Sequence, residues 1–289
     1  MKTELYKPVF IIGGVRSGTS ILGDILSQQA DLAYWLEPKY IWKYRKANSK
    51  NDIRDASDAT QHIKDYIKDR FYKYMKSQNA YRFMEKTPSN VFRVSFIHEI
   101  FPDGLFIQLI RNGHDTILST YKKWTTPIDK TAVTRRIRSN EIPLLDLPHY
   151  GAASLRDVVG RTLLPKKGFI WGQQFQGIRE YRATHTIMET CAMQWVTAMQ
   201  HSERDLMKVP DAQKFQIRYE DFVTRPEETL APLLDFLEYK DKAGIIDFAS
   251  KNVNDYTKRS RDANTLLELE KVDYIIKEEM AKWGYSYQK

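Results

Sequence analysis

The most informative chemistry in the sequence lies in a short loop near its start. Residues 8–20 read PVFIIGGVRSGTS, in which an apolar run ends at Gly13 and Gly14 and Gly18 opens a segment with helical periodicity. This strand–loop–helix pattern directs backbone N–H groups and a helix N-terminus at a phosphate. A nucleoside-triphosphatase carries a lysine where this loop has Thr19, and that lysine reaches the phosphates during transfer. The loop is therefore expected to bind a phosphate without splitting a triphosphate.

A second cationic site is predicted at the end of an apolar strand. The segment LFIQLIRNGHDTILST ends its apolar run at Arg111, and Ser119 follows in the next predicted helix. Open α/β sheets bind ligands at the carboxyl ends of their strands, and an arginine with a hydroxyl suits a phosphate monoester. A nucleoside-triphosphatase often has a metal-binding aspartate at such a strand end. The alternative for Arg111 is a structural ion pair with Asp115 or another carboxylate.

The elements that must position these residues alternate between strands and helices. Apolar runs predict strands at about 9–13 and 32–36, and in the segments YRFMEK, LFIQLIR and FQIRYE. Helical spacing predicts helices at about 18–29, 63–75 and 227–237, one in VFRVSFIHEIFPDG, one around Trp195, and a last one ending near Gly284. The fold class is therefore α/β, with a central, mostly parallel sheet flanked by helices. We interpret residues 1–289 as one domain in which the irregular stretch 127–181 is an acceptor-binding insertion or lid.

Composition narrows the class of protein. The 289 residues are 42% hydrophobic, which is enough to bury a large core, and the net charge of +8 favours an anionic ligand. The basic residues are dispersed, so a nucleic-acid partner is the weaker interpretation. The single cysteine, Cys191, excludes an internal disulfide framework and fits a reducing compartment. No signal peptide or membrane-spanning run is evident, so a cytoplasmic enzyme is expected.

The two predicted phosphate sites together imply a nucleotide with phosphates at two separate ends. Five segments follow one another along the chain: RSGTS, EKTPSN, IRNGHDTILS, RYEDFVTRP and the closing WGY. In this order they resemble the sulfotransferases that use 3′-phosphoadenosine 5′-phosphosulfate, PAPS. WGQQFQG, from Trp171, resembles a segment of bacterial members. The resemblance implies a fold like that of P-loop nucleoside-triphosphatases, PAPS as the sulfuryl donor and no metal. It assigns the 5′-phosphosulfate to Arg16, Ser17, Gly18, Thr19 and Ser20, and the 3′-phosphate to Arg111 and Ser119.

The resemblance also implies two catalytic cations. Sulfuryl transfer leaves charge on a phosphate, and preorganised donors such as Arg16 and the N–H groups of the loop stabilise such charge. Lys86, in the EKTP turn, resembles a lysine that several members direct at the bridging oxygen or the phosphate. The alternative for Lys86 is an ion pair with Glu85.

For the general base we favour Glu37. It lies 21 residues after Arg16, the interval found in the tyrosylprotein sulfotransferase branch that this region resembles. A carboxylate in a partly desolvated pocket at the sheet edge is expected to have a raised pKa. The alternative is a solvated strand end. Small-molecule sulfotransferases use a histidine base, but His98 lies inside a predicted amphipathic helix and His114 is too close to Arg111.

Two further contacts to the nucleotide follow from the resemblance. Tyr219 resembles an aromatic residue near adenine, although a tyrosine packed under the strand end would look the same. Lys258 and Arg259 lie where the family has a loop that folds over the nucleotide, together with Arg261, although a solvated basic loop is the alternative.

Two other classes of protein stay open. One is an ATP- and magnesium-dependent phosphotransferase, which would need a loop lysine and an acidic strand end. The other is a non-catalytic protein that binds nucleotides or polyanions. For the leading interpretation the acceptor is a hydroxyl, with a carbohydrate or another biosynthetic metabolite preferred, and the sequence gives no oligomeric state.

Overall fold

The computed structural model describes residues 5–46, 49–126, 170–253 and 263–286. The centre of the fold is one sheet of five strands, in which every pairing is parallel. The strands are β1 Val9–Ile12, β2 Leu32–Leu36, β3 Arg82–Lys86, β4 Leu105–Ile110 and β5 Lys214–Arg218. The sequence-based prediction of a parallel α/β fold is confirmed.

The strand order creates the crevice in which such sheets bind ligands. The order is β2-β3-β1-β4-β5, so β2 and β3 form on one side of β1 before the chain crosses to the other side to form β4. Val9 pairs with Met84 on one side and with Leu105 on the other. The carboxyl ends of β1 and β4 are therefore neighbours at a topological switch point.

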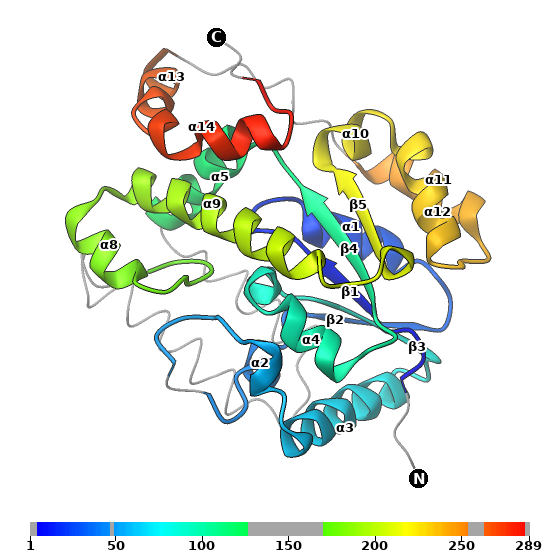
Figure 1. Cartoon of the computed structure of the whole chain (residues 1–289). Coiled ribbons are helices and arrows are strands. Elements are labelled where there is room, and N and C mark those ends of the chain that lie inside the picture. Colours follow the sequence, from blue (N-terminus) through cyan, green and yellow to red (C-terminus); the bar gives the residue numbers. More distant parts are fainter. Residues whose placement is uncertain (1–4, 47–48, 127–169, 254–262, 287–289) are drawn as a thin grey trace.

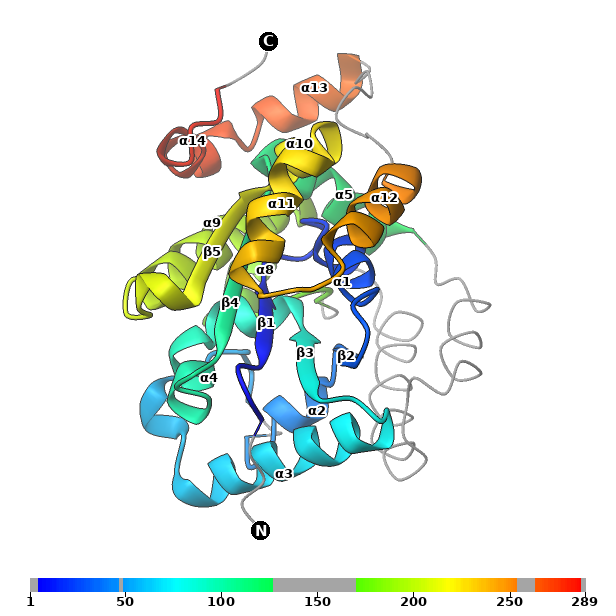
Figure 2. The same cartoon turned by 90° about the vertical axis from the view of Figure 1, so that its right-hand side faces the viewer.

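Helices cover both faces of the sheet and one of its ends (Figures 1 and 2). In the first half they are α1 Thr19–Leu26, α2 Lys39–Trp42, α3 Gln61–Ser77, α4 Val94–Ile100 and α5 Gly113–Thr125, with 3-10 turns η1 Ala56–Asp58 and η2 Pro88–Phe92. The second half has α8 Ile178–Thr184, α9 Ile187–Leu206, α10 Tyr219–Thr224, α11 Pro226–Phe236, α12 Lys242–Asn252, α13 Ala263–Glu270 and α14 Asp273–Lys282, with the 3-10 turn η4 Asp211–Gln213. In the described ranges, no helix is both long enough and apolar enough to cross a bilayer.

The alternation of side chains in β1 divides the core into two layers. Val9 and Ile11 pack with α1, α10, α11 and α12, whereas Phe10 and Ile12 pack with α2, α3 and α4. All four residues of β1 are fully buried, as a strand covered on both faces requires. The predicted helical spacing at 63–75 is also correct, because α3 turns Ile63, Ile67, Phe71 and Met75 inward.

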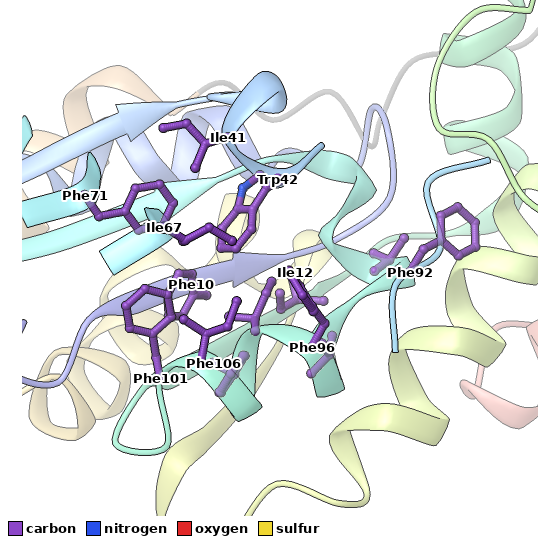
Figure 3. Packing of buried hydrophobic residues seen from close by; sticks show 14 of the residues in the cluster. Phe10, Ile12, Ile41, Trp42, Ile67, Phe71, Phe92, Phe96, Phe101 and Phe106 are labelled. Atoms are coloured by element: carbon purple, nitrogen blue, oxygen red, sulfur yellow. The ribbon is translucent and has the colours of Figure 1, made fainter. Parts of the chain in front are cut away.

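Aromatic rings fill the second of these layers (Figure 3). The ring of Phe10 lies 5.2 Å from Phe101 and 5.6 Å from Phe106, and the ring of Trp42 lies 5.1 Å from Phe71 in an edge-to-face arrangement. Such pairs add to the free energy gained from burying apolar area. Trp42 thereby anchors α2 to the sheet close to the end of β2.

A third cluster joins the end of β4 to the helices beyond it. Ile110 and Ile117 pack with Trp195 of α9 and with Ile276 and Met280 of α14. Cys191 lies in the same cluster as a buried thiol, and burial raises its pKa. Figure 1 shows α14 beyond the arrowhead of β4, so the last described helix lies close to the ligand-binding edge.

Candidate active site

The loop after β1 has the geometry of an anion-binding turn. The Ser17 hydroxyl and N–H both donate to the carbonyl of Gly14, at 2.7 and 3.2 Å, which closes the loop. Gly18 caps α1 with a φ of 96°, a left-handed conformation that favours glycine. Within the described part of the chain, the N–H groups of Gly18, Thr19 and Ser20 donate to no other group. These donors at the start of α1 are able to bind an anion.

Gly18 is also required by the residue that packs against it. A Cβ atom at Gly18 would lie 2.4 Å from a ring carbon of Tyr219, the first residue of α10. Tyr219 is almost fully buried, and the guanidinium carbon of Arg111 lies 4.1 Å from the centre of its ring. Tyr219 therefore connects the loop to the end of β4. Its contact with adenine stays a prediction.

Three residues of the two predicted phosphate sites meet in one place. The Arg16 Nε donates to the Ser119 hydroxyl of α5 at 3.0 Å, and the Arg111 Nη1 donates to the Arg16 carbonyl at 3.0 Å. Burial and the nearby Arg111 guanidinium both lower the pKa of Arg16. Among the described residues, neither arginine forms an ion pair, so the alternative of a structural pair between Arg111 and Asp115 is not observed. The Arg111 Nε is buried and has no hydrogen-bond partner there.

The predicted base and the predicted catalytic lysine form an ion pair. Lys86, at the end of β3, places its Nζ 2.9 Å from Oε1 of Glu37, which follows β2. The Lys39 Nζ lies 3.0 Å from the other carboxylate oxygen. The Lys86 side chain is 2% exposed, whereas that of Lys39 is 60% exposed. Glu37 therefore lies between the buried Lys86 and the solvent-exposed Lys39.

The pKa of Glu37 differs from the prediction. Burial raises the pKa of this carboxyl, but the charges and hydrogen bonds of Lys39 and Lys86 outweigh burial and lower it below its ordinary value. The expected raised pKa is therefore wrong for this arrangement, because the carboxylate lies between two ammonium groups. The backbone of Glu37 is left-handed, with a φ of 56°, although Pro38 follows. Arg16 shares this conformation, with a φ of 64°.

Glu85 does not pair with Lys86, so the alternative interpretation of Lys86 is wrong. Glu85 is fully buried and accepts hydrogen bonds from Thr87 at 2.5 Å, Asn90 at 2.5 Å and the Trp42 indole at 3.1 Å. Burial raises its pKa to about 7, although these hydrogen bonds lower it. Successive residues of β3 point to opposite faces, which separates Glu85 from Lys86.

The two histidines considered as bases have other partners. The His114 Nε2 lies 2.7 Å from an Asp273 carboxylate oxygen of α14. The His98 Nε2 lies 3.3 Å from the Gln213 side-chain oxygen. The contact of His98 fits a structural histidine within a helix, and His114, which was set aside for its closeness to Arg111, is paired with α14.

The residues that brace the loop from outside were not predicted from the sequence. The Gln173 side-chain oxygen accepts from the Val15 N–H at 2.8 Å, and the Gln194 amide donates to the carbonyl of Gln173 at 2.8 Å. The next residue, Gln174, donates its N–H to Asp52 at 2.9 Å. Gln173 and Gln174 fall in the segment WGQQFQG, whose resemblance to bacterial sulfotransferases was the available signal, although it assigned no contact.

Some predicted residues lie outside the described ranges. These are Lys258 and Arg259, with Arg261, and residues 127–169 of the predicted insertion. Of the residues that the structure does describe, no group of three or more His, Cys, Asp or Glu side chains is arranged to hold a metal ion.

A glycine-containing loop between the first strand of a parallel sheet and the N-terminus of a helix, with cations at the switch point, defines a P-loop-like α/β protein. The chain belongs to the sulfotransferase family, since the model of that family matches residues 8–144 and 153–242, which is most of the chain. Membership supports sulfuryl transfer as the reaction.

Solved structures give the same fold. A sulfotransferase from Mycobacterium avium, STF9, has a TM-score of 0.58 and 14% identity, over 98% of this chain and 78% of that one. The sulfotransferase domain of the Synechococcus PCC 7002 olefin synthase has a TM-score of 0.52 and 14% identity, over 99% and 100%. One from Alicyclobacillus acidocaldarius has a TM-score of 0.50 and 16% identity, over 98% of each chain. At such identities the likeness concerns the fold alone. A search of curated protein sequences gave no match.

Proposed function

We propose that this protein transfers a sulfuryl group from PAPS to a hydroxyl of an acceptor molecule. The observation that carries the proposal is the meeting of Arg16, Arg111 and Ser119 beside the N–H groups that open α1. Two guanidinium groups without carboxylate partners among the described residues call for an anionic ligand. The resemblance found in the sequence assigns these three residues to the two phosphate groups of PAPS.

The donor set fits a nucleotide with two anionic groups. The loop N–H groups and Arg16 would hold the 5′-phosphosulfate, and Arg111 with Ser119 would hold the 3′-phosphate. The buried, unpartnered Nε of Arg111 is a further donor on that side. Gly18 leaves the loop without a side chain at its closest approach to Tyr219. The predicted roles of Tyr219, Lys258 and Arg259 belong to the same proposal.

The residues of the chain have separate tasks in this reaction. PAPS supplies an activated sulfuryl group whose former phosphate partner gains negative charge as it leaves. Arg16 and the loop N–H groups would stabilise that charge, and Lys86 would add a buried ammonium group. Glu37 would take the proton of the acceptor hydroxyl while the oxygen of that hydroxyl bonds to sulfur.

The Glu37–Lys86 ion pair affects how well Glu37 can act as a base. Glu37 is ionised at neutral pH, as a base must be, but two ammonium groups weaken its affinity for a proton. A donor anion next to Lys86 would share the ammonium charge and raise the pKa of Glu37. The carboxylate would therefore become a better base when the donor is bound.

The proposal includes the acceptor and the setting. We propose a carbohydrate or another biosynthetic hydroxyl as acceptor, on the strength of the tyrosines and arginines in residues 127–181. We also propose one domain over residues 1–289 and a cytoplasmic enzyme. A screen of sugar, peptide and small-molecule hydroxyls with labelled donor would identify the acceptor.

A thermal shift measurement tests the nucleotide site. We expect adenosine 3′,5′-bisphosphate to raise the melting temperature more than ADP does, since a ligand at about 100 times its Kd stabilises a fold by roughly 2.7 kcal/mol. The variant Arg111→Ala should lose most of this shift and keep its melting temperature without ligand. Asp115→Ala, in the first turn of α5 just after Arg111, is the matched control. A response to ATP with magnesium and none to the bisphosphate would replace the proposal with a phosphotransferase.

A further inference from the structure

The junction of β5 and α10 directs three consecutive side chains to different partners. Tyr219 packs inward between Gly18 and Arg111, as described above. Arg218 and Glu220, on either side of it, contact the segment 283–285 that follows α14. One short stretch of chain therefore connects that segment to the proposed nucleotide site.

The segment 283–285 is held by both of these charged residues. The Arg218 guanidinium donates to the Trp283 carbonyl at 2.5 Å and lies 4.5 Å from the centre of the Tyr285 ring. Gly284 has a φ of 69°, which turns the chain between the two aromatic residues. The Tyr285 hydroxyl donates to the Glu220 Oε2 at 2.8 Å. This contact and burial both raise the pKa of Tyr285.

The other oxygen of Glu220 contacts the backbone next to Arg111. The Asn112 N–H donates to the Glu220 Oε1 at 2.9 Å. The carbonyl of Arg111, which belongs to the same peptide unit, accepts from the Trp195 indole at 3.3 Å. Both polar groups of this peptide unit are thus fixed, and with them the backbone from which the Arg111 side chain extends.

We propose that Tyr285 and Glu220 are positioning residues that give the site its preference for nucleotides with a 3′-phosphate. The inference rests on the proposed function, in which Arg111 binds that phosphate. Tyr285 fixes the orientation of the Glu220 carboxylate, and Glu220 fixes the Asn112 N–H. The Arg111 guanidinium is thereby held over Tyr219, facing the ligand. Neither positioning residue needs to touch the nucleotide.

The test compares two nucleotides that differ only in the 3′-phosphate. Calorimetry would give the Kd of adenosine 3′,5′-bisphosphate and of adenosine 5′-monophosphate for the wild type, Tyr285→Phe and Glu220→Gln. We expect both variants to weaken binding of the bisphosphate by roughly three- to tenfold and to leave the monophosphate almost unchanged. Tyr274→Phe is the matched control, since Tyr274 lies in α14 and donates to Glu189 at 2.8 Å, away from Arg111.

The outcomes separate the two proposals. If the wild type prefers the bisphosphate and both variants keep the same ratio of Kd values, the positioning role is wrong and the proposed function stands. An equal loss for both nucleotides also overturns the positioning role, because it indicates general damage to the fold. If the wild type itself shows no preference for the bisphosphate, the proposed function fails first.

Discussion

At the scale of single residues, two candidate catalytic residues, Arg16 in the loop and the proposed base Glu37, have unfavourable backbone conformations. Arg16 and Glu37 have positive φ values, and the residue before a proline is restricted further. Strained backbone of this kind costs about 1–3 kcal/mol per residue and persists where the surrounding contacts enforce it. The Glu37 N–H donates to the Lys86 carbonyl at 2.9 Å, in addition to the ion pair of their side chains. The backbone thus brings the carboxylate to Lys86.

The exposed partner of Glu37 should control the acid limb of the pH profile. In the wild type the pKa of Glu37 is lowered from its ordinary value of 4.5, so the carboxylate stays ionised until the pH falls below that value. Lys39→Met removes one of the two ammonium groups, which should move the acid limb of kcat/KM to higher pH. The measurement is kcat/KM for sulfuryl transfer from pH 9 down to the lowest pH at which both proteins stay folded. Lys43→Met is the control, since the Lys43 side chain pairs with Asp52.

Glu37→Gln completes this prediction. It removes the titrating group at almost unchanged volume, so we expect kcat to fall by roughly 10²- to 10⁴-fold with binding of adenosine 3′,5′-bisphosphate retained. An activity close to that of the wild type would show that another group takes the proton. An acid limb that stays in place in Lys39→Met would show that Glu37 does not set it.

The sequence could predict which side chains of the site lie at the ends of strands. Arg16 and Arg111 lie at one edge of the sheet, because the carboxyl ends of parallel strands share that edge. The direct contact between Arg16 and Ser119 was not predicted, since the sequence assigned them to two separate phosphate sites. The side-chain partners were not predictable, since Lys86 reaches Glu37 from a strand distant in sequence, and nothing in the sequence says whether the nearby Lys39 turns toward Glu37 or toward solvent. For the same reason the pKa of Glu37 was predicted in the wrong direction.

At the scale of elements, the loop after β1 depends on a segment far along the chain. Gln173 is almost fully buried and satisfies the Val15 N–H, directly before the strained Arg16. Gln174 and Asp52 exchange hydrogen bonds through the two Gln174 backbone groups, at 2.8 and 2.9 Å. The Gln173 side chain therefore braces the loop, and the backbone of the next residue, Gln174, is itself fixed by Asp52.

Adjacent glutamines offer a matched pair of variants. Gln173→Ala leaves the Val15 N–H without its partner, which should lower the free energy of unfolding by about 1–3 kcal/mol and weaken binding of adenosine 3′,5′-bisphosphate. Gln174→Ala keeps its backbone contacts, so both quantities should change little. Urea unfolding and calorimetry measure them. Equal effects of the two substitutions would contradict a role for the Gln173 side chain in bracing the loop.

The elements themselves were largely predictable from the sequence. The strand at 32–36 has the predicted bounds, and the helix predicted at 63–75 extends to Gln61–Ser77. The periodicity of apolar residues produced both results. The bracing contacts had no such signal, since a buried glutamine and a surface glutamine look alike in a sequence.

At the scale of the whole molecule, two carboxyl groups make stability depend on pH in opposite directions. Glu37 has a lowered pKa, so its contribution is present above pH 4.5 and is lost as the pH falls through its folded pKa. Glu85 has a pKa raised from 4.5 to about 7, so its contribution is full below pH 4.5 and is lost as the pH rises through about 7. The fold is therefore expected to be most stable in mildly acidic solution.

The variant Glu85→Gln tests the alkaline side of this balance. Between pH 6 and pH 9 the wild type should lose about 1–1.5 kcal/mol of unfolding free energy, because the carboxyl is already ionised in the unfolded chain while the buried one keeps its proton up to about pH 7. The glutamine variant has no proton to lose, so its stability should change less over that range. Urea unfolding at the two pH values measures the difference. Parallel losses in both proteins would assign the pH dependence to other groups.

The left-handed backbone at Arg16 and Glu37 has a consequence for the divergence of related sequences. A descendant that no longer catalyses a reaction has no need of the Arg16 side chain, and glycine or asparagine would relieve the strain at that position. At Glu37 the same change would leave the buried Lys86 ammonium group without its carboxylate, so selection for stability opposes it. Relatives that keep the fold and the Glu37–Lys86 pair but carry glycine in place of Arg16 are therefore expected to have lost catalysis.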